Sequence, residues 1–412
     1  MSRRTLPLLE VCTRITSGGT PSRSRPEYYS NGTDGHIWIK SKELLDCSLA
    51  DSEERISDLG LQKSSAKYVE AGSVLVGMYG ANVGQLGWLK SPATVNQAVC
   101  SLSADPKVAN YKWLFYALLE NRRALVSLAH GAAQQNISQE IIRGFEIEVP
   151  GLQEQEKIAA ILSVYDDLIE NNTRRIEIFE EMARRLYEEW FVQFRFPGYE
   201  GVKFKESELG LIPEGWEVVA LERAVEINPK TKVERDGEKV FVPMGALSET
   251  GMVISDWEVK SGNSGAKFQN GDTLVARISP CLENGKTGFV DFLPSSQLTA
   301  CGSTEFIVLR SRSLCPEMVY CLSRSDRFRE VAMKSMSGAT GRQRVRVESL
   351  VGYPIAQPES ELVAKYHAFA QPCFKEIRVL ANKNANLRAQ RDLLLPKLIS
   401  GEIDVSDIPM PT

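Results

Sequence analysis

The chain has 412 residues, of which 43% are hydrophobic and 25% charged, and these are the fractions of an ordinary globular protein. Its net charge of −4, from 49 basic and 53 acidic side chains, neither favours nor excludes a nucleic-acid partner, so any basic surface must be local. No apolar run approaches the ~20 residues of a membrane span, and the first residues lack the apolar segment of a signal peptide. The eight cysteines form no CxxC pair, which predicts free thiols and a cytoplasmic protein.

The first 150 residues combine short apolar runs with turns rich in Gly, Pro and Asn, which predicts a mixed domain of strands and helices. The same order of features returns over residues 214–358. Gly72-Ser-Val-Leu-Val in the first stretch, for example, recurs as Gly271-Asp-Thr-Leu-Val in the second. The sequence therefore predicts an α+β protein with two pseudo-repeated mixed α/β domains, at 1–150 and 214–358.

A long segment with a heptad pattern follows each domain, at residues 151–196 and 359–400, with a linker at 197–213 and a tail at 401–412. A sustained 3.5-residue repeat of apolar side chains is typical of a coiled-coil seam, so we predict two long helices that pair antiparallel. The alternative is two unrelated amphipathic helices, each lying on its own domain. The main predicted seam residues are Leu162, Ile169, Ile176, Phe179, Leu186, Ile377, Leu380, Leu387 and Leu394.

No motif in the chain predicts an enzyme site. The GKT tripeptide at 285–287 is not a P-loop, because the glycine required five residues before Gly285 is replaced by Pro280. There is no GxSxG elbow, and none of His36, His130 and His367 pairs with another at metal-ligand spacing. We therefore predict no catalytic residue and no metal ligand in this chain.

Positive charge is concentrated in one part of the second domain. Residues 324–346 hold seven basic and two acidic side chains, and GATGRQRV at 338–345 reads as a loop whose arginines can contact phosphates or guanine. The equivalent place in the first domain is GAAQQNIS at 131–138, whose amide side chains suit adenine. The alternative for either segment alone is a solvated loop. With a second basic cluster near the N-terminus, the candidate DNA contacts are Arg23, Arg25, Lys40, Gln134, Gln135, Asn136, Arg277, Lys286, Arg342, Arg344 and Arg346.

Four stretches of the chain resemble the specificity subunit of type I restriction-modification systems. GLIPEGWE at 210–217 resembles the opening of the second target recognition domain, and GDTLVARISPCLENGKTGFV at 271–290 resembles a marked stretch within such domains. EQEKIAAILSVYDDLIENN at 154–172 resembles the central spacer helix, and LISGEIDV at 398–405 resembles the C-terminal end. The first domain has VGMYGANVGQL in place of ARISPCLENGK, which puts the first half-site in doubt and not the family.

The resemblance implies a non-catalytic DNA-binding subunit. Each recognition domain would read one half of a bipartite, asymmetric site in double-stranded DNA, and the paired helices would set the spacing and dock two methyltransferase subunits. Restriction and translocase subunits would join that core. S-adenosylmethionine, ATP and magnesium would be used only by those partners, so no cofactor is expected on this chain.

Two other functions remain open from the sequence. One is a standalone DNA-binding or architectural protein without enzyme partners, which would not co-purify with a methyltransferase. The other is an enzyme whose active site follows no known motif, which would methylate or cleave DNA as the purified chain alone.

Overall fold

The structure is a computed structural model, and it describes residues 3–30, 32, 34–131, 135–294, 298–339 and 342–409. The chain divides into two compact units. Unit 1 comprises Met1–Ile169 with Asn386–Thr412, and unit 2 comprises Glu170–Ala385. Each unit therefore contains one mixed domain together with part of each of two long helices. In the described part of the chain, no helix is both long enough and apolar enough to cross a membrane.

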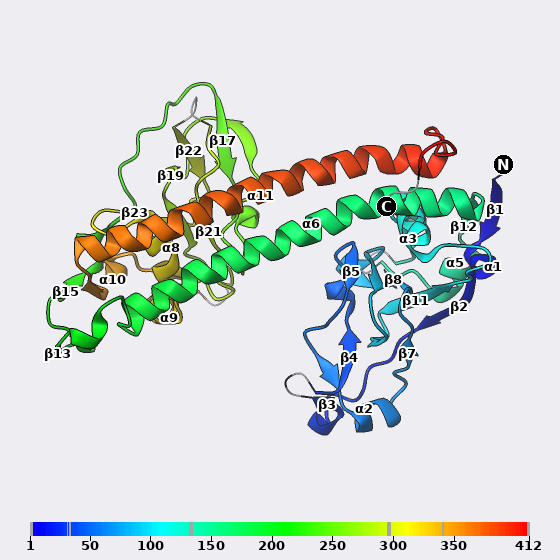
Figure 1. The fold of residues 1–412 in the computed structure, drawn as a ribbon, viewed down its shortest axis with the longest axis horizontal. Helices are drawn as coiled ribbons and strands as arrows, with labels where there is room; N and C mark the ends of the chain where they lie inside the picture. Colours follow the sequence, from blue (N-terminus) through cyan, green and yellow to red (C-terminus); the bar gives the residue numbers. More distant parts are fainter. Residues whose placement is uncertain are drawn as a thin grey trace. The chain divides into compact units, whose positions relative to one another are not determined.

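Unit 1 is built from two five-stranded sheets and a short antiparallel pair (Figure 1). The pair consists of β1 (Arg4–Pro7) and β12 (Glu146–Val149). The first sheet has the order β2 (Cys12–Ser17), β11 (Val99–Ala104), β8 (Val74–Gly77), β9 (Leu86–Leu89) and β5 (Cys47–Leu49). The second has the order β3 (Tyr29–Ser30), β6 (Arg55–Ile56), β4 (His36–Ile39), β10 (Ala93–Val95) and β7 (Tyr68–Val69). The helices of this domain are α1 (Leu8–Val11), α2 (Asp58–Gln62), α3 (Tyr111–Glu120), α4 (Arg122–Ser127) and α5 (Gln139–Gly144).

Unit 2 has two four-stranded sheets and three short pairs. The sheets have the orders β16 (Val225–Ile227), β23 (Phe306–Ser311), β20 (Thr273–Ala276), β21 (Thr287–Phe289) and β18 (Glu258–Ser261), β17 (Glu238–Val242), β22 (Thr299–Gly302), β19 (Ala266–Gln269). The pairs are β13 (Phe204–Ser207) with β14 (Gly210–Pro213), β15 (Glu217–Ala220) with β26 (Pro354–Gln357), and β24 (Met336–Ser337) with β25 (Arg344–Val345). The helices are α7 (Leu221–Ala224), α8 (Pro316–Arg324), α9 (Asp326–Lys334) and α10 (Glu348–Val351).

The predicted repeat is confirmed by the strand order. The sheet β2-β11-β8-β9 of unit 1 has its counterpart in β16-β23-β20-β21 of unit 2, and the pair β1-β12 has its counterpart in β15-β26. In the other sheet of each unit, a strand runs parallel to its neighbour, which in turn pairs antiparallel with a third: β4, β10 and β7 in unit 1, and β17, β22 and β19 in unit 2. The central strands β8 and β20 are buried at every position, which explains their continuous apolar runs.

The two long helices are α6 (Leu152–Tyr187), which continues into a π-helical turn at Glu188–Val192, and α11 (Ser360–Ser400). In unit 1, Asp166 of α6 forms an ion pair of 2.6 Å with Arg391 of α11. In unit 2, Arg175 pairs with Glu376 at 3.1 Å, and the Tyr366 hydroxyl donates to the Ala183 carbonyl at 3.0 Å. From Arg175 to Ala183 along α6, the partner residue on α11 changes from Glu376 to Tyr366. The helices therefore run antiparallel in unit 2, as predicted.

Most of the proposed seam faces inward. Leu162, Ile169, Ile377 and Leu380 are buried, and the remaining seam residues Ile176, Phe179, Leu186, Leu387 and Leu394 are partly buried. Two polar residues interrupt this stripe in unit 2, where the Asn172 amide donates to Asn384 Oδ1 at 2.9 Å. Both asparagines are buried, and a buried amide pair of this kind fixes the register of two helices.

Candidate nucleic-acid interface

The loop at 131–138 of unit 1 is held against the sheet by its backbone. His130 and Asn136 exchange two backbone hydrogen bonds of 2.9 Å, and the Ile137 N–H donates to the Met78 carbonyl at 3.0 Å. The Ile137 side chain is completely buried and anchors the end of the loop. Gln135 and Asn136 are exposed just before this anchor. Gln134, a predicted contact, lies outside the described residues.

Unit 2 anchors its loop at 338–345 in the same way. The Val345 N–H donates to the Arg277 carbonyl at 2.9 Å, and the Ser279 N–H donates to the Gln343 carbonyl at 3.0 Å. Val345 is buried like Ile137, while Arg342 and Arg344 are exposed. The two loops, which were matched in the sequence, therefore end at equivalent positions in the two domains.

At this position unit 2 carries a cluster of three charged side chains. The Nε and Nη2 atoms of Arg344 donate to the Glu305 carboxylate at 2.7–3.0 Å, and Arg277 Nη2 donates to the Val345 carbonyl at 3.1 Å. The hydrogen bonds from Arg344, and then the positive charges of Arg344 and Arg277, hold the pKa of Glu305 below its usual value. Glu305 was not predicted from the sequence, because it lies 39 residues from Arg344, in the turn directly before β23.

Unit 1 has uncharged side chains at the corresponding places. The Met78 N–H donates to the Ala98 carbonyl at 2.8 Å, just as the Arg277 N–H donates to the Glu305 carbonyl at 2.9 Å. Met78 and Ala98 are thus the counterparts of Arg277 and Glu305, and Asn136 is the counterpart of Arg344. The frameworks match, but the side chains at these positions differ in charge.

The other candidates in unit 2 lie near this cluster in the chain. Arg346 is exposed, and its Nε donates to Ser337 Oγ at 3.1 Å across the β24–β25 hairpin. Lys286 directly precedes β21, and its carbonyl accepts a hydrogen bond from the Ala276 N–H at 3.0 Å. Its side chain is partly exposed.

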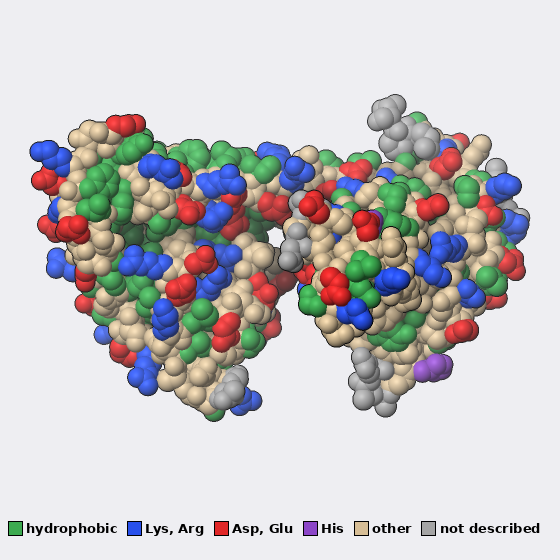
Figure 2. Space-filling model, turned by 90° about the horizontal axis from the view of Figure 1, so that it is seen from below, with side chains coloured by type: hydrophobic (Ala, Val, Ile, Leu, Met, Phe, Trp, Pro, Cys, Tyr) green, Lys and Arg blue, Asp and Glu red, His purple; other side chains and the backbone are tan. Residues whose placement is uncertain are grey.

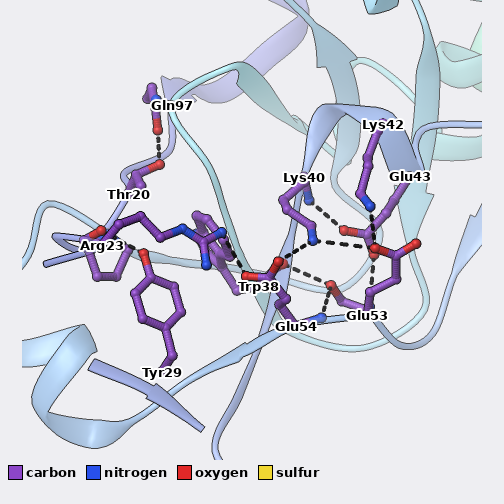
Figure 3. A network of polar contacts seen from close by, with 12 residues as sticks. Thr20, Arg23, Tyr29, Trp38, Lys40, Lys42, Glu43, Glu53, Glu54 and Gln97 are labelled. Atoms are coloured by element: carbon purple, nitrogen blue, oxygen red, sulfur yellow. Dashed lines mark hydrogen bonds and ion pairs between the residues drawn. The ribbon is translucent and has the colours of Figure 1, made fainter. Parts of the chain in front are cut away.

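The N-terminal basic cluster is neutralised by carboxylates (Figure 3). Arg23 pairs with Glu54 at 2.7 Å, and Lys40 pairs with Glu54 at 2.7 Å and with Glu53 at 3.4 Å. Hydrogen bonds from Lys40 and Arg23 lower the pKa of Glu54. Phosphates would have to compete with these carboxylates for the same cations.

Aromatic rings complete this cluster. The Arg23 guanidinium lies 4.3 Å from the centroid of the Tyr29 ring and 5.2 Å from that of Trp38. Such stacking holds the arginine in place through cation–π attraction. Arg25, the third candidate here, is exposed and lies 3.5 Å from Glu27.

Basic and acidic side chains are mixed on the face of the protein seen in Figure 2, with no broad surface of one sign. This agrees with the near-neutral composition. A DNA contact would therefore depend on individually placed arginines and amides. Apart from these loops, unit 2 brings together Cys315, Glu317 and His367 as the types of side chain that could hold a metal ion.

The chain has clear relatives. Residues 5–180 match the family model described as the type I restriction modification DNA specificity domain. The MjaIX specificity subunit of a Methanocaldococcus jannaschii type I restriction enzyme is 25% identical over 410 residues, covering 96% of this chain and 92% of the relative. The HindI specificity subunit of Haemophilus influenzae is 23% identical and covers 71% of this chain and 77% of the relative. A crystal structure of the type I S subunit from M. genitalium shares the fold, with a TM-score of 0.57 and 15% identity over 97% of this chain and 96% of that one.

Proposed function

We propose that the chain is a type I restriction-modification specificity subunit, and that it selects the DNA sequence on which a methyltransferase complex acts. Each unit reads one half of a bipartite, asymmetric site in double-stranded DNA. The observation that carries this proposal is the pair of loops at 131–138 and 338–345, which have matching anchors and different exposed side chains. Two domains with the same framework but different exposed side chains suit a DNA site whose two halves differ in sequence.

In unit 2 the proposed base-reading residue is Arg344. Glu305 occupies its Nε–Nη2 edge, so the Nη1–Nη2 edge of the guanidinium is directed away from that carboxylate. An arginine presents such an edge to guanine O6 and N7 in the major groove. A carboxylate that fixes the guanidinium in advance lowers the entropy lost on binding. Glu305 is therefore a positioning residue for Arg344.

In unit 1 the proposed base-reading residues are Gln135 and Asn136. Both are exposed and precede the buried anchor Ile137. Amide side chains pair bidentately with adenine N6 and N7. Their loop has no counterpart of Glu305, since Ala98 stands at that position. We propose that an amide needs less electrostatic support than an arginine.

The partners of the subunit are two methyltransferase subunits, with restriction and translocase subunits added to that core. Helix α6 offers apolar side chains for such docking, because Val164 and Leu168 in unit 1 and Ile178 and Met182 in unit 2 are 42–49% exposed. We assign no catalytic residue to this chain, and S-adenosylmethionine, ATP and magnesium belong to the partners.

The reading role of Arg344 is tested by methylation of a randomised site library with the assembled complex. Arg344→Ala should weaken binding to the cognate site by ~1–3 kcal/mol and relax base selection at a single base pair. Arg346→Ala is the matched control, with the same charge change on the same hairpin, and it should weaken all sequences alike. If Arg344→Ala also weakens all sequences alike, Arg344 is a phosphate contact and the proposal fails.

The positioning role of Glu305 needs a separate experiment. Glu305→Gln keeps the size of the side chain but removes its charge, so Arg344 loses its fixed orientation. We expect base selection at the pair that Arg344 contacts to fall. Binding to nonspecific DNA should rise, because one negative charge near the DNA phosphates is lost. A fall in binding to every sequence would indicate misfolding and not repositioning.

The helices are proposed to set the gap between the two half-sites. Inserting one matched heptad into both α6 and α11 preserves the seam and lengthens each helix by ~10 Å. That equals about three base pairs at ~3.4 Å each. The preferred gap should change while both half-sites stay the same. Altered half-sites with an unchanged gap would contradict the spacer role.

A further inference from the structure

We propose that Cys315, Glu317 and His367 form a zinc site that joins the start of α8 to α11 in unit 2. One potential ligand atom from each residue lies within 4.8 Å of the other two. In a tetrahedral zinc site with bonds of ~2.0–2.3 Å, neighbouring ligand atoms are about 3.3–3.6 Å apart. Modest side-chain rotations therefore bring the three atoms to bonding distance.

The backbone places these residues on two different helices. Cys315 is the N-cap residue of α8 and Glu317 lies in its first turn, while His367 lies in the second turn of α11. Cys315 and Glu317 are buried, but the His367 side chain is 37% exposed. The site is thus closed on two sides by protein and open to solvent beside the imidazole, where water can supply a fourth ligand.

The donor set favours zinc over the hard cations. Thiolate and imidazole suit Zn²⁺, whereas Mg²⁺ and Ca²⁺ take oxygen ligands. The Glu317 carboxylate and His367 Nδ1 form a hydrogen bond of 2.7 Å. Burial, and then the charge of Glu317, raise the pKa of the Cys315 thiol. A bound divalent cation would offset the buried carboxylate and release the thiol proton.

In unit 1, the corresponding contact between the start of α3 and the long helix α6 is made by amide groups. The N-cap residue of α3 is Asn110, whose side chain accepts from the Lys112 and Trp113 N–H groups at 2.9 and 3.2 Å. Its backbone N–H donates to Gln155 of α6 at 2.8 Å. Neutral amides therefore hold α3 to its long helix in unit 1, and the Cys-Glu-His cluster takes that place in unit 2.

Cobalt titration of the full chain tests the site, because a Co²⁺–thiolate bond gives a charge-transfer band in the near ultraviolet. We expect one Co²⁺ per chain with this band, loss of the band on adding Zn²⁺, and no band in Cys315→Ser. Cys281→Ser is the matched control, since it removes a partly exposed thiol outside the cluster and should keep the band. The His367→Ala variant should bind Co²⁺ at least tenfold more weakly.

The wild-type protein decides the question even if a variant fails to fold. Binding of Co²⁺ without a thiolate band would show adventitious oxygen or imidazole ligands and overturn the proposal. No binding would overturn it as well, and would leave Glu317 and His367 as a hydrogen-bonded pair only. As a second measurement, Zn²⁺ should raise the Tm of the wild-type chain and release protons on binding.

Discussion

The two units differ most in the charge of their side chains at the place where their backbone frameworks agree best. Both hold a loop end by an N–H donated to the end of the central strand, from Ile137 to Met78 in unit 1 and from Val345 to Arg277 in unit 2. Around these equal anchors, unit 2 gathers charged side chains and unit 1 neutral ones. Buried backbone bonds and one apolar anchor thus leave the neighbouring exposed positions free to vary.

This comparison separates two tasks that one loop performs. The anchor residue fixes the path of the backbone, so a change there alters stability. The residue just before the anchor, Asn136 or Arg344, is exposed, so a change of its side chain leaves the buried anchor in place. Specificity can therefore change by substitution without rebuilding the domain, and the predictions below depend on this separation.

The largest expected effect concerns what the two units share, which is contact with the DNA backbone. If the assembled complex neutralises six to ten phosphates, affinity should fall ~10³–10⁵-fold between 50 and 200 mM salt. Arg344→Asn and Asn136→Ala should each alter base selection. The slope of log affinity against log salt concentration should stay within about one unit of the wild-type value. Titration of labelled DNA at several salt concentrations measures both. A flat salt response would contradict DNA as the ligand.

Exchanging the reading residues should exchange the base preference. Asn136→Arg with Ala98→Glu reproduces the charged pair of unit 2 in unit 1, and we expect selection to move from adenine toward guanine at one base pair, by ~1–3 kcal/mol. Asn136→Arg alone is the control, since an unsupported arginine should strengthen binding to all sequences. Methylation of a randomised library distinguishes the two. Identical profiles for the single and double variants would show that the carboxylate has no positioning role.

The asparagine pair tests whether the difference between the units resides in the loops alone. Asn384→Leu leaves the buried amide of Asn172 without its partner, which should lower the free energy of unfolding by ~1–3 kcal/mol. The double variant Asn172→Leu with Asn384→Leu should recover most of this loss, because both polar groups are gone. Denaturant unfolding measures the stability, and library methylation should report unchanged half-sites. A change of half-site bases would mean that the helices take part in reading.

Much of the fold could be predicted because its signals are local or repeated. The 3,4 spacing from Leu162 to Leu186 predicts α6, and the recurrence of Gly72-Ser-Val-Leu-Val at Gly271 predicts the second domain. The site could be predicted only in part. The position of Arg344 in a glycine-containing loop was visible, but its pairing with Glu305 depends on two segments that are 39 residues apart in the chain and meet only in the folded domain. The same applies to Cys315 and His367, which lie on different helices.

The N-terminal cluster shows what sequence counting misses. Arg23 and Lys40 indicate a basic surface when the chain is read locally, yet the structure places the carboxylate of Glu54 between them. Segment totals of basic and acidic residues are nearly equal there, but totals do not say which charges meet. These two cations can contact DNA only if a phosphate displaces the Glu54 carboxylate from them.

The smallest expected effect is the response of this cluster to acid. The pKa of Glu54 is lowered from 4.5 by the hydrogen bonds from Lys40 and Arg23, so its charge stabilises the fold above about pH 4.5. That contribution is lost as the pH falls through the lower pKa of the folded state. Because the Glu54 side chain is 34% exposed, solvent screening limits its value to under about 1 kcal/mol.

Glu54→Gln removes this contribution. At pH 7 the variant should unfold at slightly lower denaturant concentration than the wild type. Below the lowered pKa of Glu54 the two should converge, because the wild-type carboxyl is then protonated too. The substitution also removes the ion-pair partner of Arg23 and leaves Lys40 paired with Glu53, so the salt slope of DNA binding should steepen by about one if Arg23 touches a phosphate. Glu27→Gln is the control, since its partner Arg25 lies 3.5 Å away in an exposed pair. An unchanged salt slope in Glu54→Gln would remove the N-terminal cluster from the interface and leave recognition in unit 1 to the loop beside Asn136.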